Sequence, residues 1–216
     1  MSVPRFSSVV IDVDSTLCGI EGIDWLATKR GPVVSDAIAK LTDRAMNGEV
    51  PLESLYGERL ALVKPTAADV DALSRAYVDA LAPGARESIF RLRDAGVAVT
   101  MVSGGIRQAI RPLARVLGFS DGSLHAVSVS FGDAGEWLGY DESSPMTTQL
   151  GKRALVATLG LARPTLAVGD GATDAAMRDA VDAFAAFTGF VRRENVVRSA
   201  DYVISSFGEL TTLVLS

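Results

Sequence analysis

The chain has 216 residues, of which 48% are hydrophobic and 22% are charged, a balance typical of a folded globular protein rather than a disordered one. Its 21 Lys and Arg residues and 26 Asp and Glu residues give a net charge of −5, so no overall positive field favours nucleic acid. The single cysteine, Cys18, excludes an intramolecular disulfide, and no apolar run approaches the roughly 20 residues that span a bilayer. These features predict a cytoplasmic protein with neither nucleic acid nor membrane as a partner.

The first element is a hydrophobic run that starts near Phe6 and ends in the sequence Val9-Val10-Ile11-Asp12-Val13-Asp14-Ser15-Thr16. This pattern predicts a buried strand with the carboxylates of Asp12 and Asp14 near its carboxyl end, where open α/β sheets bind ligands. Two neighbouring acids repel each other unless a cation or a proton lies between them, so the pair suggests Mg²⁺ and chemistry on an oxyanion. Taken alone, the same residues could instead cap a helix.

Helical spacing then dominates from about residue 19 to residue 80. Pro51 begins a third helical segment, and Thr66 with Asp69 forms a capping-box pattern at the start of a fourth. Four short helices between two strands do not fit a single βαβ crossover. We therefore expect a helical insert, called the cap below, over residues 19–80, with residues 1–18 and 81–216 forming the core. The cap would lie over the edge of the sheet, as a lid does.

Helical and strand patterns alternate again after Pro83-Gly84. This alternation predicts an α/β fold with a doubly wound, mostly parallel sheet. The predicted strands cover residues 97–102, 165–168, 183–187 and 202–204, the predicted helices lie near residues 89–96, 106–117, 150–159 and 174–179, and an antiparallel hairpin is expected over residues 125–140.

Three further segments place polar groups at the predicted sheet edge. Ser103-Gly104-Gly105 follows a strand at the start of a helix, where free N–H groups and the helix dipole favour a phosphate. Lys152 begins a later helix, an unfavourable place for a cation unless it faces an anion. Gly169-Asp170-Gly171-Ala172-Thr173-Asp174 adds two acids and a hydroxyl. Taken one at a time, these segments are also compatible with a glycine-rich turn, a solvated lysine and a helix cap.

The order of the four elements resembles the haloacid dehalogenase (HAD) superfamily of phosphotransferases, with its HAD-like Rossmannoid fold. Further stretches narrow the resemblance to the phosphoserine phosphatase family, and the similarity covers nearly the whole chain. These stretches are Glu21-Gly22-Ile23-Asp24, residues 42–60, Tyr140-Asp141-Glu142 and Asp201-Tyr202.

The resemblance implies a role for each motif residue. Asp12 would attack phosphorus to give an aspartyl-phosphate, and Asp14 would protonate the leaving oxygen and later deprotonate the attacking water. Asp12, Asp170 and the carbonyl of Asp14 would hold Mg²⁺. Asp174 would orient Lys152 or support the metal site from behind its ligands. The residues that would hold the phosphoryl oxygens are Ser103, Gly104, Gly105 and Lys152.

The resemblance also implies the substrate, O-phosphoserine, whose ammonium and carboxylate call for an acid and a bidentate cation. Glu21 and Arg59 match these two roles. Further substrate contacts are implied for Met46, Thr173 and Arg193. Two positions depart from the family pattern, because Leu52 stands where Phe is common and Asn47 replaces a Gly beside the pocket.

We therefore expect a Mg²⁺-dependent phosphatase that hydrolyses O-phospho-L-serine to L-serine and phosphate, a reaction of serine biosynthesis. One alternative is the same chemistry on another small phosphorylated metabolite, or phosphoryl transfer to an alcohol. A remote alternative is a non-catalytic phospho-acceptor module. That reading predicts a shorter chain without the insert and an acceptor acid on a middle strand. A homodimer is left open.

Overall fold

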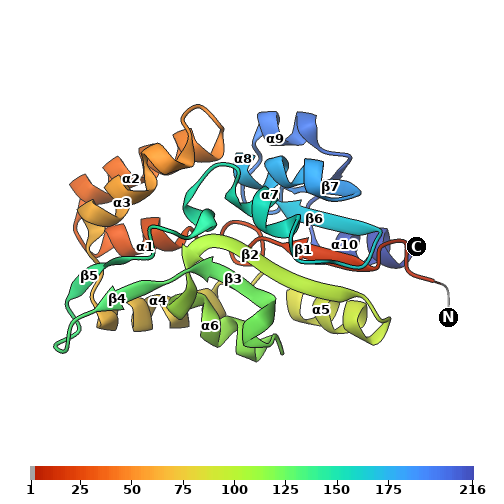
Figure 1. Ribbon diagram of the computed structural model, residues 1–216, viewed down its shortest axis with the longest axis horizontal. Coiled ribbons are helices and arrows are strands. Elements are labelled where there is room, and N and C mark those ends of the chain that lie inside the picture. The colour runs from red at the N-terminus through yellow and green to blue at the C-terminus, as the bar shows by residue number, and fades with distance from the viewer. Residues whose placement is uncertain (1–2) are drawn as a thin grey trace.

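A six-stranded parallel sheet forms the centre of the core in the computed structural model, which describes residues 3–216 (Figure 1). Strand order reverses direction beside β1, so the sheet is doubly wound, as the sequence predicts, and its carboxyl edge at β1 is the place where such sheets bind ligands. In spatial order the strands are β3 (Leu124–Val127), β2 (Ala98–Ile106), β1 (Ser8–Ile11), β6 (Thr165–Gly169), β7 (Ala183–Phe187) and β8 (Tyr202–Ile204).

The central strand β1 is buried over its whole length. It pairs in parallel with β2 on one side and with β6 on the other, with Ile11 opposite Met101 and Val168. A parallel strand covered on both faces needs a continuous hydrophobic run, which the segment Val9-Val10-Ile11 supplies. The chain positions that follow β1 and β6 therefore emerge side by side at the same edge.

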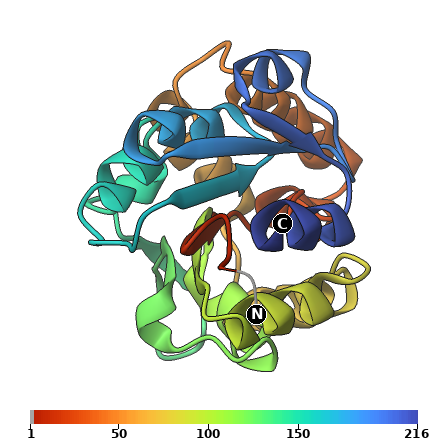
Figure 2. The same ribbon diagram turned by 90° about the vertical axis from the view of Figure 1, so that its right-hand side faces the viewer.

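Helices cover both faces of the sheet (Figures 1 and 2). Right-handed crossovers place the helices of connections that run toward β3 on one face and those of connections that run toward β8 on the opposite face, and the C-terminal helix α10, which is not a crossover, packs beside α5. The first face carries α5 (Ala85–Asp94), α6 (Arg107–Val116) and α10 (Phe207–Leu215), and the second carries α7 (Gly151–Val156), α8 (Ala172–Ala175), a 3₁₀ segment (Ala176–Ala180) and α9 (Glu194–Ser199).

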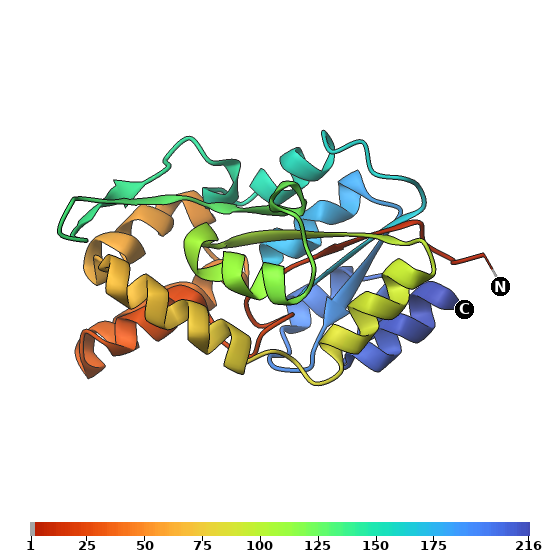
Figure 3. The same cartoon turned by 90° about the horizontal axis from the view of Figure 1, so that it is seen from below.

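The segment after β1 folds into four α-helices, α1 (Gly22–Thr28), α2 (Pro32–Met46), α3 (Tyr56–Val63) and α4 (Ala67–Asp79), with a 3₁₀ turn (Leu52–Ser54) before α3. Thr66 and Asp69 form a capping box at α4, in which the Asp69 N–H donates to Thr66 Oγ1 at 3.2 Å. Helix α4 lies against α6 of the core (Figure 3). The exact division at residues 19–80 stays a prediction.

Two sequence expectations are wrong in detail. The segment 125–140 is not one hairpin: β3 pairs in parallel with β2, and only β4 (Val129–Phe131) and β5 (Trp137–Tyr140) form the antiparallel pair. Strand alternation does not reveal which neighbour a strand chooses. Strand β2 also continues through Ser103 and the two glycines to Ile106, with a register shift against β3 after Val102. Within residues 3–216 no helix is both long enough and apolar enough to cross a bilayer.

Candidate active site

A cavity at the carboxyl edge of the sheet lies between the core and the cap. Its core wall carries acids and a lysine from the predicted motifs, and its cap wall carries residues from α1 to α3. The lining residues used below are Asp12, Asp14, Gly104, Gly105, Lys152, Asp170 and Thr173 from the core, and Glu21, Gly22, Met46, Leu52, Tyr56 and Arg59 from the cap.

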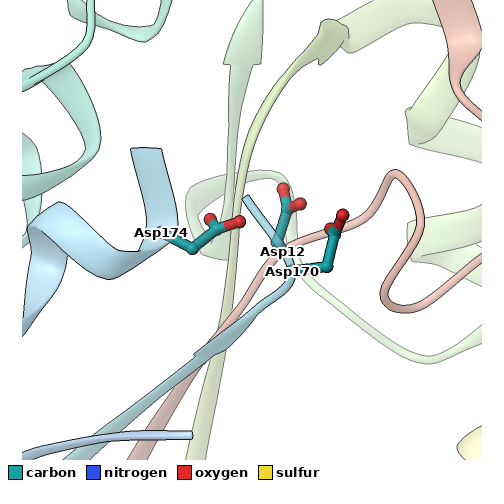
Figure 4. Close-up of side chains that lie close together, drawn as sticks. All are labelled: Asp12, Asp170 and Asp174. Atoms are coloured by element: carbon teal, nitrogen blue, oxygen red, sulfur yellow. The ribbon is translucent and has the colours of Figure 1, made fainter. Parts of the chain in front are cut away.

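Three buried carboxylates meet where β1 and β6 end (Figure 4). Asp12 follows β1, Asp170 follows β6, and Asp174 lies in α8 one turn further on. One carboxylate oxygen from each lies within 4.8 Å of the others, the spacing of a group that can share one metal ion. Figure 4 shows Asp12 and Asp170 side by side, with Asp174 pointing toward Asp12.

Lys152 bridges two of these acids. Its Nζ lies 2.6 Å from Oδ1 of Asp12 and 2.7 Å from Oδ1 of Asp174. Burial alone would lower the pKa of this lysine, but the two carboxylates raise it above its ordinary value, so the side chain is charged. The second oxygen of Asp174 accepts the Gly171 N–H at 3.0 Å. Asp174 therefore has one donor on each oxygen, and its contact with Nζ fixes the position of Lys152.

Gly151, which precedes Lys152, is required by close packing. A Cβ atom at this position would lie 1.5 Å from the carbonyl oxygen of Pro145. The glycine therefore lets the start of α7 approach the preceding loop and directs Lys152 into the core.

The site holds more negative than positive charge. On the core side, the acids Asp12, Asp14, Asp170 and Asp174 are accompanied by two buried cations among residues 3–216, Lys152 and Arg193, the second of which contacts Asp170. Burial raises the pKa of Asp170 to about 8 in spite of Arg193, and burial with Asp174 raises that of Asp12. Two uncompensated negative charges in an oxygen-lined site match a divalent cation. These residues therefore fit a metal ion.

Asp14 is held by three donors. Its Oδ1 accepts the Gly22 N–H at 2.6 Å and the Tyr77 hydroxyl at 2.7 Å, and its Oδ2 accepts the Ser103 hydroxyl at 3.1 Å. Burial raises the pKa of Asp14, and the hydrogen bond from Tyr77 offsets part of that rise. Burial therefore favours the protonated form of this carboxyl, as a general acid requires.

The segment Ser103-Gly104-Gly105 reaches the cavity as a strand extension. The Gly105 N–H donates to Ser103 Oγ at 2.9 Å, and Gly104 lines the cavity. Helix α6 begins only at Arg107, so the expectation that this segment opens a helix, with its dipole facing the phosphate, is wrong. The strand instead continues along the sheet direction, so that Gly104 and Gly105 line the cavity while the buried Ser103 hydroxyl donates to Asp14.

On the cap side, Glu21 and Arg59 face the same cavity. Glu21 accepts the Ser15 hydroxyl at 2.7 Å, and burial together with Asp14 raises its pKa to about 8. Arg59 is 4% exposed and pairs with Asp24 at 3.0 Å through Nη2, while its buried Nε has no partner within residues 3–216. That unpaired donor fits a carboxylate that comes from a ligand.

The remaining predicted residues lie nearby. Met46 and Thr173 line the cavity, from the end of α2 and from α8. Arg193 is buried with its guanidinium on Asp170 rather than free in the cavity.

Sequence reasoning missed two tyrosines. The Tyr77 hydroxyl donates to Asp14 and the Tyr56 hydroxyl to the Gly104 carbonyl at 2.9 Å, and the sequence patterns indicate neither contact. The available signal was a phenolic hydroxyl in an otherwise apolar helical stripe, because a buried tyrosine hydroxyl needs a partner.

Comparisons with known proteins agree with this geometry. The family profile of haloacid dehalogenase-like hydrolases matches residues 6–182. The chain is 39% identical over 208 residues to the chloroplastic phosphoserine phosphatase of Arabidopsis thaliana, covering 94% of this chain and 70% of that protein. It is 37% identical over 206 residues to the phosphoserine phosphatase of Homo sapiens, with 94% and 91% covered.

Solved structures show the same fold. A structure described as a phospho-aspartyl intermediate analogue of phosphoserine phosphatase superimposes with a TM-score of 0.83 at 26% identity, covering 96% of this chain and 98% of that one. A phosphoserine phosphohydrolase-like protein from Francisella tularensis superimposes with a TM-score of 0.89 at 24% identity, covering 97% and 100%.

Proposed function

The chain belongs to the haloacid dehalogenase-like hydrolases and, within them, to the phosphoserine phosphatase family, and from this premise we propose that it hydrolyses O-phospho-L-serine with Mg²⁺ as its metal. One observation carries the proposal. Residues suited to bind a phosphate, around Lys152 on the core, and residues suited to bind an amino acid, Glu21 and Arg59 on the cap, line the same cavity. The ester would place its phosphate on the core and its amino acid head on the cap.

Asp12 is the nucleophile in this proposal. Lys152 binds one oxygen of its carboxylate, and within residues 3–216 no side chain donates to the other. That free oxygen forms a bond to phosphorus while the bond from phosphorus to the serine oxygen breaks. The product of this half-reaction is an aspartyl-phosphate.

Asp14 moves the proton in both half-reactions. Its carboxyl proton goes to the serine oxygen as that oxygen leaves phosphorus. The resulting carboxylate then takes a proton from water, whose oxygen attacks phosphorus and releases phosphate and the Asp12 carboxylate. Lys152 and Gly104 would supply donors for the phosphoryl oxygens. Ser103, whose hydroxyl donates to Asp14, and Gly105, whose N–H donates to Ser103, would have to release these contacts in order to bind the phosphate.

Mg²⁺ would be held by Asp12, Asp170 and the carbonyl of Asp14. When bound, the ion neutralises charge between the anionic nucleophile and the anionic phosphate. Asp174 accepts the ammonium of Lys152 on one oxygen and the Gly171 N–H on the other, so we assign this acid to orienting the lysine beside the metal site.

The cap residues recognise the serine part of the ester. Glu21 would accept the ammonium, and the free Nε of Arg59 would complete a two-pronged contact with the carboxylate. Met46 and Thr173 would contact the substrate from the cavity wall, whereas a substrate contact by Arg193 would require its guanidinium to leave Asp170. The product, L-serine, assigns the enzyme to amino acid biosynthesis; the cytoplasmic location and the homodimer stay predictions.

Phosphate release from O-phospho-L-serine with and without Mg²⁺ tests the proposal. Asp12→Asn should abolish turnover, and Arg59→Ala should lose phosphoserine turnover while retaining most hydrolysis of an aryl phosphate. Arg111→Ala is the control, because it removes an exposed arginine of α6 that pairs with Asp121.

The outcomes separate the two candidate functions. Activity of the wild type on phosphoserine without metal would contradict the proposal. Hydrolysis of an aryl phosphate through Asp12, with no turnover of phosphoserine, would instead favour another small phosphate ester. Leu52 is the observation behind that second candidate, since it leaves a smaller side chain in the cavity wall than the family's Phe.

A further inference from the structure

We propose that Tyr77, a cap residue outside the motifs, is a positioning residue for the acid-base carboxyl of Asp14, and that Gly22 provides the space this contact needs. The inference rests on the proposed function, because it assigns the proton transfers to Asp14. Tyr77 lies near the C-terminal end of α4 in the cap, and its hydroxyl donates to Oδ1 of Asp14 in the core at 2.7 Å.

The three donors on Asp14 are divided unequally between its oxygens. Oδ1 receives the Tyr77 hydroxyl and the Gly22 N–H, whereas Oδ2 receives one donor from the described part of the chain, the Ser103 hydroxyl. Two donors satisfy the in-plane lone pairs of a carboxylate oxygen, so Oδ1 is the fixed oxygen. The proton that leaves and returns during catalysis is therefore carried on Oδ2.

The glycine at position 22 is explained by space rather than by backbone freedom. Gly22 is the first residue of α1 and is not among the residues with positive φ. A Cβ atom there would lie 2.0 Å from the Tyr77 hydroxyl oxygen and 3.2 Å from Asp14 Oδ1. Any other residue would push the tyrosine away from the carboxylate.

A second glycine flanks the other oxygen. A Cβ atom at Gly105 would lie 2.8 Å from Asp14 Oδ2. The carboxyl group thus sits in a slot between two glycines, with Tyr77 closing one end. Such a slot leaves the carboxyl few rotamers, and a general acid needs its proton held within hydrogen-bond reach of the leaving oxygen.

Tyr77 is itself firmly anchored. Its side chain has no exposed surface, and its backbone carbonyl accepts the Cys18 thiol at 3.2 Å. This contact ties the end of α4 to the loop that follows β1, on which Asp14 lies. A phenylalanine would fill the same volume and keep this anchor, so only the hydroxyl contact would be lost.

The proposal predicts a loss that depends on the leaving group. Serine is an alkyl leaving group that needs a proton as it departs, whereas nitrophenolate departs without one. A displaced Asp14 should therefore slow phosphoryl transfer to Asp12 from phosphoserine far more than from p-nitrophenyl phosphate. A general loosening of the fold would slow transfer from both esters alike.

Rapid-quench single-turnover measurements on Tyr77→Phe test this with both esters. We expect transfer from phosphoserine to slow about tenfold or more, with the KM for phosphoserine within about twofold of wild type, and transfer from p-nitrophenyl phosphate to slow less than about threefold. Tyr202→Phe is the matched control, because it removes a hydroxyl that contacts Arg5 in the core, away from the cavity. Equal slowing with both esters, or no slowing with phosphoserine, would overturn the proposal.

Gly22→Ala gives an independent check. In the wild-type background the new methyl group displaces the Tyr77 hydroxyl, so the variant should show the same leaving-group dependence. In the Tyr77→Phe background it should add little further selectivity between the esters, because the contact is already lost. Fully additive effects would contradict the assignment of Gly22.

Failure of the proposed function would look different. If the wild type hydrolyses p-nitrophenyl phosphate but not phosphoserine, the substrate assignment fails, and the comparison is repeated with an alkyl phosphate that the wild type does accept. If Asp12→Asn remains active, the mechanism fails whatever Tyr77→Phe does.

Discussion

The Nζ atom of Lys152 lies 2.6 Å from Oδ1 of Asp12, although 140 residues separate the two along the chain. The contact neutralises the attacking carboxylate before any substrate arrives, and it leaves the second oxygen of Asp12 free of side-chain donors within residues 3–216. Because Asp174 holds the same ammonium from the other side, the lysine cannot follow the substrate. The phosphate of the substrate therefore meets a lysine ammonium that is already held in place, and such preorganised charge stabilises the developing negative charge of a transition state.

Lys152→Gln tests this arrangement. We expect kcat for phosphoserine to fall by about 100-fold or more, since one fixed donor facing the developing charge is lost. The buried Asp12 and Asp174 would also be left without their cation, so the Tm should drop. Steady-state kinetics and thermal unfolding measure the two effects. Lys40→Gln, which removes an exposed lysine in α2, should change neither, and an active Lys152→Gln enzyme would contradict the assignment.

Much of the fold and of the core site could be predicted from sequence because both follow from local patterns. Continuous hydrophobic runs identify parallel strands, and the residues directly after each run must emerge at one edge of the sheet. That rule alone predicts that Asp12 and Asp170 lie together, as they do in the structure. The motif order then supplies the chemistry of Lys152 and Asp174.

Contacts set by tertiary packing could not be predicted in the same way. The alternation in residues 125–140 fits either an edge strand or a hairpin, and the structure contains both. The hydroxyl of Tyr77 reaches Asp14 only because α4 packs against the core at a particular height, which no periodicity in α4 encodes. Likewise, the pairing of Arg193 with Asp170 depends on where the loop before α9 falls.

Metal binding should stabilise the protein. The buried acids repel one another, so a divalent ion that joins Asp12 and Asp170 removes a cost of folding. Mg²⁺ at 100 times its Kd should raise the Tm by about 5 to 10 °C, because ligand at that concentration contributes about 2.7 kcal/mol. Differential scanning fluorimetry across a Mg²⁺ titration measures the shift. Asp170→Asn should abolish the Mg²⁺-dependent shift in Tm. The control is Asp133→Asn, which changes an exposed acid in a hairpin turn and should keep the shift. A shift retained in Asp170→Asn would mean that the metal binds elsewhere.

Recognition of the substrate ammonium should depend on pH through Glu21. Burial and the charge of Asp14 raise the pKa of Glu21 to about 8, so this carboxyl is neutral below that pH and charged above it. Only the charged form attracts the ammonium of phosphoserine. The ratio of kcat/KM for phosphoserine to kcat/KM for p-nitrophenyl phosphate should therefore rise between pH 6 and pH 8. Glu21→Gln should lower this ratio and make it independent of pH, and a flat ratio in the wild type would contradict the assignment.

Closure of the cap over the substrate should depend on Tyr56. Its hydroxyl donates to the Gly104 carbonyl at 2.9 Å, and its ring packs edge to face against Tyr140 with 5.3 Å between centroids. The hydroxyl thus joins α3 directly to the segment that would hold the phosphate. Tyr56→Phe keeps the ring and removes one neutral hydrogen bond worth about 1 kcal/mol, so the KM for phosphoserine should rise about fivefold.

The hydrogen bond from Tyr56 to Gly104 joins the cap to the core and does not involve the reacting atoms. Its loss should therefore change kcat by less than about twofold. Steady-state kinetics on phosphoserine separates these two parameters. Tyr140→Phe is the matched control, since it removes a hydroxyl from the facing ring and leaves the bond to Gly104 in place. A large fall in kcat with an unchanged KM would show that Tyr56 acts on the chemical step instead of on closure.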